Sequence, residues 1–308
     1  MFLPGDGFGH QRDGARNPLV SPEPAAAAAP AGLPGLDAAW SRLIEAGGRT
    51  FHVLDNGVRD AGLTLVCVHG NPTWSYTWRS VISPAPPAVR VIAIDQLDMG
   101  FSERTGTTRR LAQRVQDLGA VIDALAIEGP IVTVGHDWGG AISLGWAIDN
   151  VDRLAGVVLA NTAVHQPEGA RAPLLIRMVR PFINWVCLRL PMFVWGAALL
   201  ARPRLGKSVR NAYLAPYRTA QRRAAIGDFV ADIPLEAHHP SYDSLARIAA
   251  GLERLAGVPA LLLWGPSDPV FSDLYLRDLE RRLPHADVHR FVGAGHLVVE
   301  DADVAGTI

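Results

Sequence analysis

The chain has 308 residues, 49% of them hydrophobic, and a formal net charge of −1 at pH 7. This composition argues against overall disorder, and the near-neutral charge argues against nucleic-acid binding by the chain as a whole. Two cysteines, Cys67 and Cys187, are too few for a disulfide framework, and no basic and apolar signal pattern opens the sequence. We therefore expect a cytoplasmic protein.

The pattern along the chain predicts four segments. Residues 1–35 are rich in Gly, Pro and Ala and are expected to be a disordered leader. Strand-like and helical patterns alternate over residues 36–161 and again over 241–308, which predicts a mostly parallel sheet covered on both faces. Between 162 and 240 the alternation stops, and we expect an inserted helical cap there.

The first strands are marked by apolar runs. Residues 48–54, the turn-like Asp-Asn-Gly at 55–57 and a strand-like run to His69 predict a β-hairpin. Residues 89–95 predict a further buried strand. Residues 109–125 carry apolar side chains at helical spacing.

The cap segment is unusually apolar over residues 174–200. A membrane-spanning helix is the alternative interpretation, but three arginines and two prolines interrupt the run at positions 177, 180, 181, 189 and 191. This pattern favours a cap whose inner face lines a tunnel for long alkyl chains. Its outer face is a candidate for contact with a membrane or with a partner.

Residues 135–140 read Gly-His-Asp-Trp-Gly-Gly and follow the apolar run 131–134. This pattern resembles the nucleophile elbow of the α/β-hydrolases, in which an apolar strand is followed by a turn with the nucleophile between small residues and then by a helix. Glycines permit the strained turn. Asp137 occupies the position where serine is usual, and a carboxylate nucleophile forms an ester with substrate carbon that water must then cleave.

Two later residues complete a catalytic set in the order nucleophile, acid, histidine. Asp268 follows the apolar run 260–263, and His296 follows the strand-like run 288–292 within Gly-Ala-Gly-His. A carboxylate fixes the imidazole tautomer, and the imidazole can then deprotonate water. Alone, Asp268 could be a turn residue and His296 a surface residue, but their order favours catalysis.

Two residues are candidate donors to a leaving anion. The strand-like run 65–68 is followed by His-Gly-Asn-Pro-Thr-Trp at 69–74. In this fold, the loop after that strand and the residue after the nucleophile each contribute a backbone N–H to the oxyanion hole. Asn71 adds a side-chain amide and Trp138 an indole N–H, which suit a halide, a carboxylate or an alkoxide. The alternatives are a turn role for Asn71 and simple packing for Trp138.

These motifs together resemble the haloalkane dehalogenase group over residues 51–300, that is, an α/β-hydrolase fold with a helical cap. The resemblance implies Asp137 as nucleophile, His296 as base, Asp268 as acid, and Asn71 with Trp138 as leaving-group donors. One dehalogenase branch carries its acid after the strand that follows the elbow helix. Here that strand ends in Asn-Thr at 161–162, so Asp268 has no nearby competitor.

Within this group, residues 95–102, 159–166 and 264–271 resemble the β-lactone decarboxylases of long-chain olefin biosynthesis, especially those of actinobacteria. Many dehalogenases have Gly at the position of Asp98, so Asp98 departs from their pattern. The resemblance implies a small hydrophobic substrate, a cis-β-lactone, that yields a cis-alkene and carbon dioxide. It also implies a fused or associated β-lactone synthetase. The helix expected to begin at 300–303 stops at Ile308, so we expect a truncated C-terminal helix.

Other functions remain open. A haloalkane dehalogenase would use the same five residues, and a non-catalytic scaffold subunit would need none of them. An epoxide hydrolase would need ring-opening tyrosines in the cap, and Tyr213 and Tyr217 are candidates. No cofactor is expected, because no phosphate-binding or dinucleotide pattern follows a strand. No metal is expected at His238 and His239, because adjacent side chains point apart.

Overall fold

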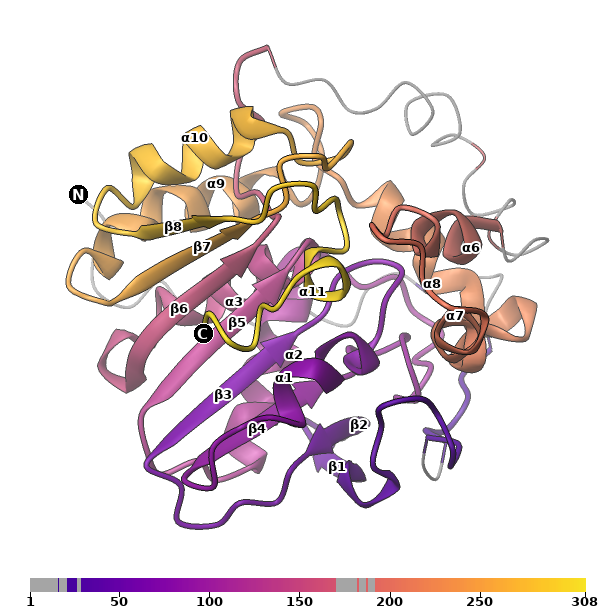
Figure 1. Ribbon diagram of the computed structural model, residues 1–308. Coiled ribbons are helices and arrows are strands. Elements are labelled where there is room, and N and C mark those ends of the chain that lie inside the picture. Colours follow the sequence, from indigo (N-terminus) through magenta and orange to yellow (C-terminus); the bar gives the residue numbers. More distant parts are fainter. Residues whose placement is uncertain (1–15, 17–20, 27–28, 170–181, 183–186, 188–191) are drawn as a thin grey trace.

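The computed structural model describes residues 16, 21–26, 29–169, 182, 187 and 192–308. Its centre is an eight-stranded sheet with strand order β1-β2-β4-β3-β5-β6-β7-β8 (Figure 1). The pairs β1–β2 and β2–β4 are antiparallel, and every other neighbouring pair is parallel. The predicted mostly parallel sheet is therefore confirmed. The strands are β1 (Ser41–Ala46), β2 (Arg49–Asp55), β3 (Leu63–Val68), β4 (Val89–Ile94), β5 (Ile131–His136), β6 (Leu154–Ala160), β7 (Ala260–Trp264) and β8 (Asp287–Arg290).

Burial follows the position of each strand in the sheet. The inner strands β3, β5, β6 and β7 are almost continuously apolar and mostly buried, because helices cover both of their faces. In contrast, β8 reads Asp-Val-His-Arg and is exposed at all four positions. Charged side chains on this edge strand disfavour pairing with another chain.

Helices cover the sheet in two layers. The larger core cluster includes apolar residues of α2 (Leu111–Ala124), α3 (Trp138–Ala147), α9 (Tyr242–Gly251) and α10 (Asp273–Arg282). The smaller cluster includes residues of α1 (Arg79–Ile82) and α11 (Val298–Asp301) on the other face. Short 3-10 helices span Ala38–Trp40, Ser75–Trp78, Val151–Arg153, Ala215–Tyr217 and Leu252–Leu255.

Within the predicted cap, the structure describes three helices, α6 (Met192–Ala198), α7 (Lys207–Leu214) and α8 (Ala220–Ala231). Figure 1 shows them grouped together to one side of the sheet, beyond the ends of β3 and β5. Much of the apolar run 174–200 lies outside the described residues. Within the described part, no helix has both the length and the apolar character needed to cross a bilayer.

The predicted hairpin at residues 48–69 is wrong. The hairpin instead joins β1 to β2 through Gly47 and Gly48, whose φ angles are +57° and +73°. Two consecutive left-handed residues suit a tight hairpin turn, and glycine adopts them without steric cost. The strand β2 pairs with β4 and not with β3, so the Asp-Asn-Gly segment is a crossover between non-neighbouring strands.

Both chain ends also differ from expectation. In the predicted disordered leader, Ala29 is buried in the core and Ala26 and Leu33 pack against it, while Glu23 and Arg104 exchange backbone hydrogen bonds of 2.9 and 2.8 Å. Residues 1–15, 17–20 and 27–28 lie outside the described residues. The helix expected to begin at 300–303 in fact ends at Asp301, because Ala302 is extended.

Candidate active site

Asp137 lies between β5 and α3 in a sharp turn. Its backbone has φ +54° and ψ −127°, a conformation that is uncommon for a residue with a side chain and is typical of functional sites. The turn requires glycine on both sides: an added Cβ would lie 2.5 Å from the Gly139 carbonyl at Gly135, and 2.0 Å from the Val68 carbonyl at Gly139. The elbow geometry read from the sequence is therefore present.

Backbone N–H groups hold the Asp137 carboxylate. The N–H of Asn71 donates to Asp137 Oδ1 over 2.8 Å, and the backbone N–H of Trp138 donates to the same carboxylate. Burial raises the pKa of Asp137, and His296 with these two donors opposes that rise without cancelling it. The two N–H groups predicted to form an oxyanion hole thus contact the candidate nucleophile itself.

His296 lies between the two carboxylates. Its Nδ1 is 3.0 Å from Asp268 Oδ2, and its Nε2 is 4.0 Å from Asp137 Oδ2. Burial alone would lower the pKa of His296, but the charge and hydrogen bond of Asp268, with the charge of Asp137, raise that pKa to about 9. The structure therefore brings the three residues together in the order nucleophile, histidine, acid.

Asn161 supports the acid and was not assigned a role from the sequence. Its side-chain amide donates to Asp268 Oδ2 over 2.9 Å and to the Gly265 carbonyl over 3.1 Å, while its Oδ1 accepts from the Gly265 N–H over 2.7 Å. The sequence feature that could have identified Asn161 is its position at the end of the strand after the elbow helix, where one dehalogenase branch has an acid. Asn161 fixes the Asp268 carboxylate without adding a second charge.

The cap helix α8 contacts both candidate leaving-group donors. The Asn71 amide donates to the Ile226 carbonyl over 3.1 Å, and the Phe229 ring lies edge-on to the Trp138 ring with centroids 5.7 Å apart. The Arg114 guanidinium, which is buried, lies over the Phe229 ring 3.6 Å from its centroid. Asn71 Oδ1 has no hydrogen-bond partner among the described residues.

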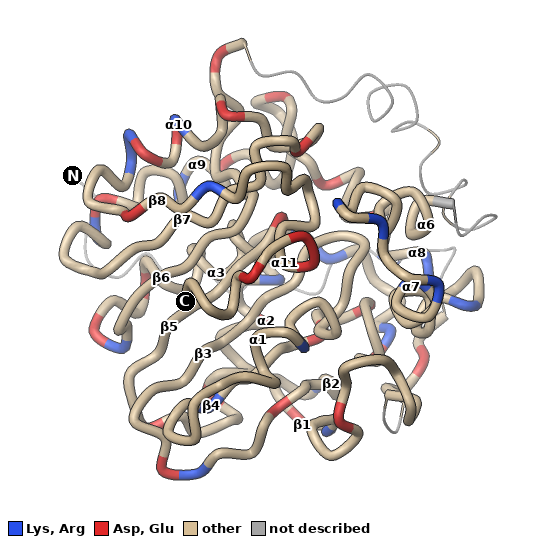
Figure 2. The backbone as a smooth tube through the Cα atoms, viewed as in Figure 1, with Lys and Arg blue, Asp and Glu red and all other residues tan. Residues whose placement is uncertain are grey.

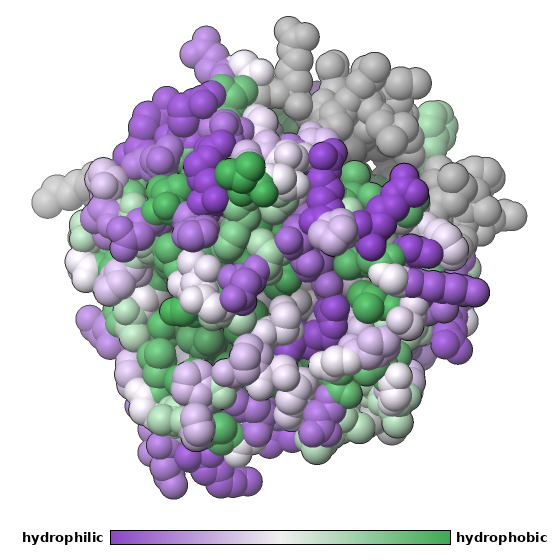
Figure 3. Space-filling model, viewed as in Figure 1, coloured by the Kyte–Doolittle hydropathy of each residue, from purple (hydrophilic) through white to green (hydrophobic). Residues whose placement is uncertain are grey.

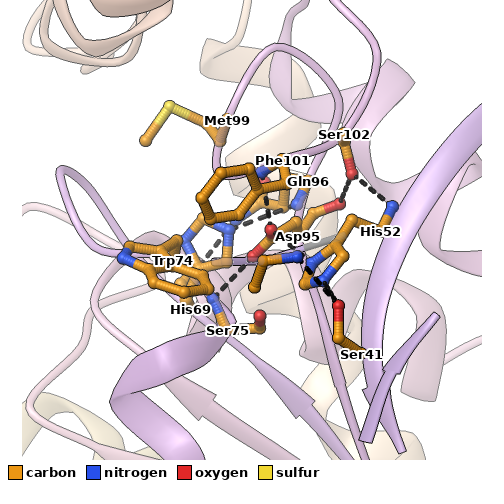
Figure 4. Close-up of polar contacts among 12 residues, drawn as sticks. Ser41, His52, His69, Trp74, Ser75, Asp95, Gln96, Met99, Phe101 and Ser102 are labelled. Atoms are coloured by element: carbon orange, nitrogen blue, oxygen red, sulfur yellow. Dashed lines mark hydrogen bonds and ion pairs between the residues drawn. The ribbon is translucent and has the colours of Figure 1, made fainter. Parts of the chain in front are cut away.

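A buried network supports the loop that carries Asn71 (Figure 4). Asp95 accepts from the Ser75 N–H over 2.7 Å and from the Phe101 N–H over 2.8 Å, and it lies 2.8 Å from His52 Nδ1. On the far side of the imidazole, His52 Nε2 is 2.8 Å from Ser41 Oγ. Burial alone would raise the pKa of Asp95, but the charge and hydrogen bond of His52, with His69 and the Phe101 N–H, outweigh burial and lower it. The side chains of His52 and Asp95 are fully buried, so this network positions loops.

The two cap tyrosines do not fit the role of ring-opening acids. The Tyr213 hydroxyl donates to Glu300, and the Tyr217 hydroxyl donates to the Thr73 carbonyl over 2.9 Å. Both side chains are buried, and burial raises the pKa of each hydroxyl. They connect the cap to the core, which argues against an epoxide hydrolase.

The two adjacent histidines have separate surroundings. His238 is exposed beside Glu236, and His239 Nε2 lies 3.1 Å from the Ala231 carbonyl. Among the described residues, no group of three or more His, Cys, Asp or Glu could hold a metal ion. Both cysteines are buried and free.

Comparison with family models decides the family. Residues 64–303 match the model described as alpha/beta hydrolase fold. The chain belongs to the alpha/beta hydrolase fold family. A solved member, the haloalkane dehalogenase DatA from Agrobacterium tumefaciens C58, superposes with a TM-score of 0.77 at 20% identity, covering 87% of this chain and 94% of that one. This likeness supports the fold alone.

Curated relatives of this hydrolase narrow its group. A cis-3-alkyl-4-alkyloxetan-2-one decarboxylase from Shewanella oneidensis is 33% identical over 83% of this chain and 82% of its own length. Its counterpart from Xanthomonas campestris pv. campestris is 34% identical over 87% and 93%. Haloalkane dehalogenase 2 from Mycobacterium tuberculosis is 31% identical over 85% and 90%. The chain is thus a member of the haloalkane dehalogenase-like group, whose named relatives are enzymes.

Proposed function

We propose that this hydrolase is a cis-β-lactone decarboxylase. It would convert a four-membered lactone with two alkyl substituents into a cis-alkene and carbon dioxide. The two decarboxylases at 33% and 34% identity support the substrate class. The observation that carries the mechanism is the Asp137 carboxylate held by the backbone N–H groups of Asn71 and Trp138.

These N–H contacts favour attack on a ring carbon. In a serine esterase, the oxyanion hole receives the carbonyl oxygen of the substrate. Here the same donors are engaged by Asp137, so attack on the lactone carbonyl would find no free hole for the new oxyanion. Asp137 instead attacks the ring carbon that bears the ring oxygen. The C–O bond breaks, and its electrons remain on a released carboxylate.

The second step regenerates the nucleophile. The bond between the neighbouring carbon and the released carboxylate breaks, and its electron pair forms the C=C bond. The bond from carbon to Asp137 breaks at the same time, so carbon dioxide and the aspartate carboxylate are both released. Inversion in the first step followed by anti elimination in the second keeps the two alkyl groups cis. No water and no oxidant are consumed.

The remaining site residues would stabilise charge. The side-chain amide of Asn71 and the indole N–H of Trp138 donate to the carboxylate released by ring opening. His296, whose pKa is raised to about 9, is an imidazolium at neutral pH. Its positive charge stabilises the Asp137 carboxylate as that carboxylate leaves the substrate carbon in the second step. Asp268 holds that imidazolium, and Asn161 holds Asp268. The role of each residue is part of the proposal.

Haloalkane dehalogenation is the second candidate, supported by the relative at 31% identity. Asp137 would displace a halide, and His296 would then deprotonate the water that cleaves the ester. That reaction needs a neutral His296. Esterification removes the Asp137 charge and so favours the neutral form.

The test compares the two substrate classes. The purified protein is given a cis-3,4-dialkyl β-lactone and, separately, 1-bromo- and 1-chloroalkanes. The proposal predicts a cis-alkene from the lactone and little halide from the haloalkanes. Halide release without alkene would replace the proposal by the second candidate.

Three further assignments belong to this proposal. We place the enzyme in the cytoplasm, and we infer an adenylate-forming β-lactone synthetase, fused or associated, as the source of the lactone. We also divide the chain into a core of residues 36–161 and 241–308 with a cap of 162–240. Co-purification with the synthetase would test the partner.

A further inference from the structure

Positive charge is concentrated in the cap sequence. Between Glu168 and Asp228 there are 59 residues, of which 11 are Arg or Lys and none is Asp or Glu. The other 249 residues hold the remaining 18 basic residues and all 30 acidic ones. A chain with a net charge of −1 therefore carries a strongly basic segment and a strongly acidic remainder.

Part of this segment forms a surface with both apolar and basic side chains. Trp195 and Leu199, on and just after α6, are 46% and 49% exposed. Arg202, Arg204 and Lys207 follow within eight residues of Leu199 and are exposed. We call these five residues the α6–α7 surface. Figure 2 shows basic residues on the loop after α6 and on α7, and Figure 3 shows apolar side chains among hydrophilic ones on the cap side.

Two of the three basic side chains of this surface have no acidic partner among the described residues, whereas Arg202 lies close enough to Asp301 for its charge to oppose the rise that burial causes in the pKa of that carboxyl. Among the described residues, Arg204 and Lys207 form no ion pair, and the sequence places no acidic residue on α6, on α7 or between them. In contrast, Arg222 and Arg223 on α8 are engaged, the first by Glu23 and the second by the Cys187 carbonyl. The charges of Arg204 and Lys207 are therefore available to a partner.

The α6–α7 surface adjoins the loop of His296. The Arg202 N–H donates to Asp301 Oδ1 over 2.6 Å, and the Gly295 N–H donates to Asp301 Oδ2 over 2.7 Å. One carboxylate thus joins the loop after α6 to the residue before His296. A ligand entering past α6 would arrive next to the candidate site.

We propose that the α6–α7 surface docks on an anionic lipid membrane, so that the hydrophobic substrate passes from the bilayer into the site beneath the cap. Exposed Trp and Leu beside Arg and Lys are typical of proteins that lie at a membrane interface. An acidic protein partner would account for the arginines and the lysine but not for the exposed Trp195 and Leu199. The delivery of substrate, though not the docking, rests on the proposed function.

The test measures sedimentation of the full chain with vesicles of phosphatidylcholine, with and without about one third phosphatidylglycerol. Wild-type protein binds the anionic vesicles, and binding weakens as salt rises. Arg204→Glu with Lys207→Glu lowers the partition coefficient by about 25-fold or more, since each basic residue near the surface contributes about a fivefold factor. Trp195→Ser with Leu199→Ser also lowers it.

Matched controls lie away from the cap. Arg59→Glu with Arg277→Glu makes the same change of charge at exposed positions that form no ion pair among the described residues, and Val292→Ser removes a side chain that is 96% exposed. Equal loss of binding in the control variants would overturn the docking surface. Failure of the wild-type protein to bind anionic vesicles would also overturn it. If the wild-type protein is a dimer, and the cap variants become monomers but still bind vesicles, the surface is a dimer interface and the membrane proposal is overturned as well.

Activity separates this inference from the proposed function. The cap variants should turn over a water-soluble short-chain β-lactone at the wild-type rate and lose rate on a long-chain lactone embedded in anionic vesicles. Equal rates on the embedded lactone would overturn substrate delivery from the bilayer. If wild-type protein forms no alkene from either lactone, the proposed function fails while vesicle binding still tests the surface.

Discussion

Asn161 donates its side-chain amide to Asp268 Oδ2 over 2.9 Å, and the same oxygen lies 3.0 Å from His296 Nδ1. Asn161 is itself fixed by two hydrogen bonds with the backbone of Gly265. The acid therefore depends on a side-chain amide that does not titrate, and the backbone carbonyl of the same residue accepts from the Asp137 N–H over 3.2 Å. Since Asn161 is fully buried, water cannot replace its bonds.

Replacing Asn161 should impair the acid while Asp137 stays in place. Asn161→Ala removes one bond to Asp268 Oδ2, while the Val270 N–H still donates to Oδ1 over 2.6 Å, so we expect the carboxylate to be held less firmly and kcat to fall about tenfold. Asn161→Asp should cost more, because a second carboxylate beside Asp268 would raise the pKa of one of them. Steady-state kinetics with the β-lactone measure both. Asn150→Ala, which breaks a bond to the Trp146 carbonyl, is the control and should keep its activity.

The ionisation of His296 should make stability depend on pH. Its pKa is raised to about 9 in the folded protein, against about 6.5 for an unfolded histidine. The stabilisation is fully present below pH 6.5 and is lost as pH rises to 9, with an upper limit on the order of 3 kcal/mol. Chemical unfolding of wild type and His296→Gln at pH 6 and pH 9 measures it. A difference between the two proteins that stays constant over this range contradicts the prediction.

The cap tyrosines should contribute to stability and not to chemistry. Tyr217→Phe removes the hydrogen bond to the Thr73 carbonyl and the one accepted from the Gly100 N–H, and it should lower the free energy of unfolding by about 2 kcal/mol. Because the hydroxyls donate to Glu300 and to the Thr73 carbonyl, Tyr213→Phe and Tyr217→Phe should keep alkene formation within about twofold of wild type. If the rate of alkene formation fell a hundredfold or more in either variant, the tyrosine concerned would have to be assigned a role as a catalytic acid.

Phe229 should position Trp138. Its ring lies edge-on to the indole, and the buried Arg114 cation lies over the ring. A buried cation–π contact of this kind stabilises by about 2 kcal/mol. Phe229→Leu should reduce kcat about tenfold, and Trp138→Phe should reduce it about a hundredfold. Phe51→Leu is the control, since Phe51 is equally buried in the core. If Phe51→Leu reduces kcat as much as Phe229→Leu, the effect is one of packing alone.

The sequence was most informative where one backbone geometry demands particular residues. The elbow could be predicted because Gly135 and Gly139 leave no room for a Cβ, and the inner strands because they are almost continuously apolar. The hairpin at Gly47 and Gly48 was missed because Asp-Asn-Gly at 55–57 has an equally good turn composition. Which strands become neighbours depends on the whole sheet, and local composition does not report it.

Long-range contacts account for the other differences. Asp98 departs from the dehalogenase pattern at a left-handed position, φ +69°, where glycine is favoured. It is accommodated there with its carboxylate accepting from the Thr105 N–H over 2.6 Å. The links from Asn161 to Asp268, from Asn71 to Ile226 and from Glu23 to Arg104 likewise join segments far apart in sequence. No local pattern predicts them.

The most direct test of the central claim follows alkene formation from a cis-3,4-dialkyl β-lactone in wild type, Asp137→Asn and Asp137→Ala. Gas chromatography with mass spectrometry identifies the product, and circular dichroism verifies that the variants are folded. The account predicts cis-alkene and carbon dioxide from wild type and no turnover from either variant. Alkene formed by Asp137→Ala at the wild-type rate would contradict it, because decarboxylation would then proceed without the carboxylate that the elbow presents.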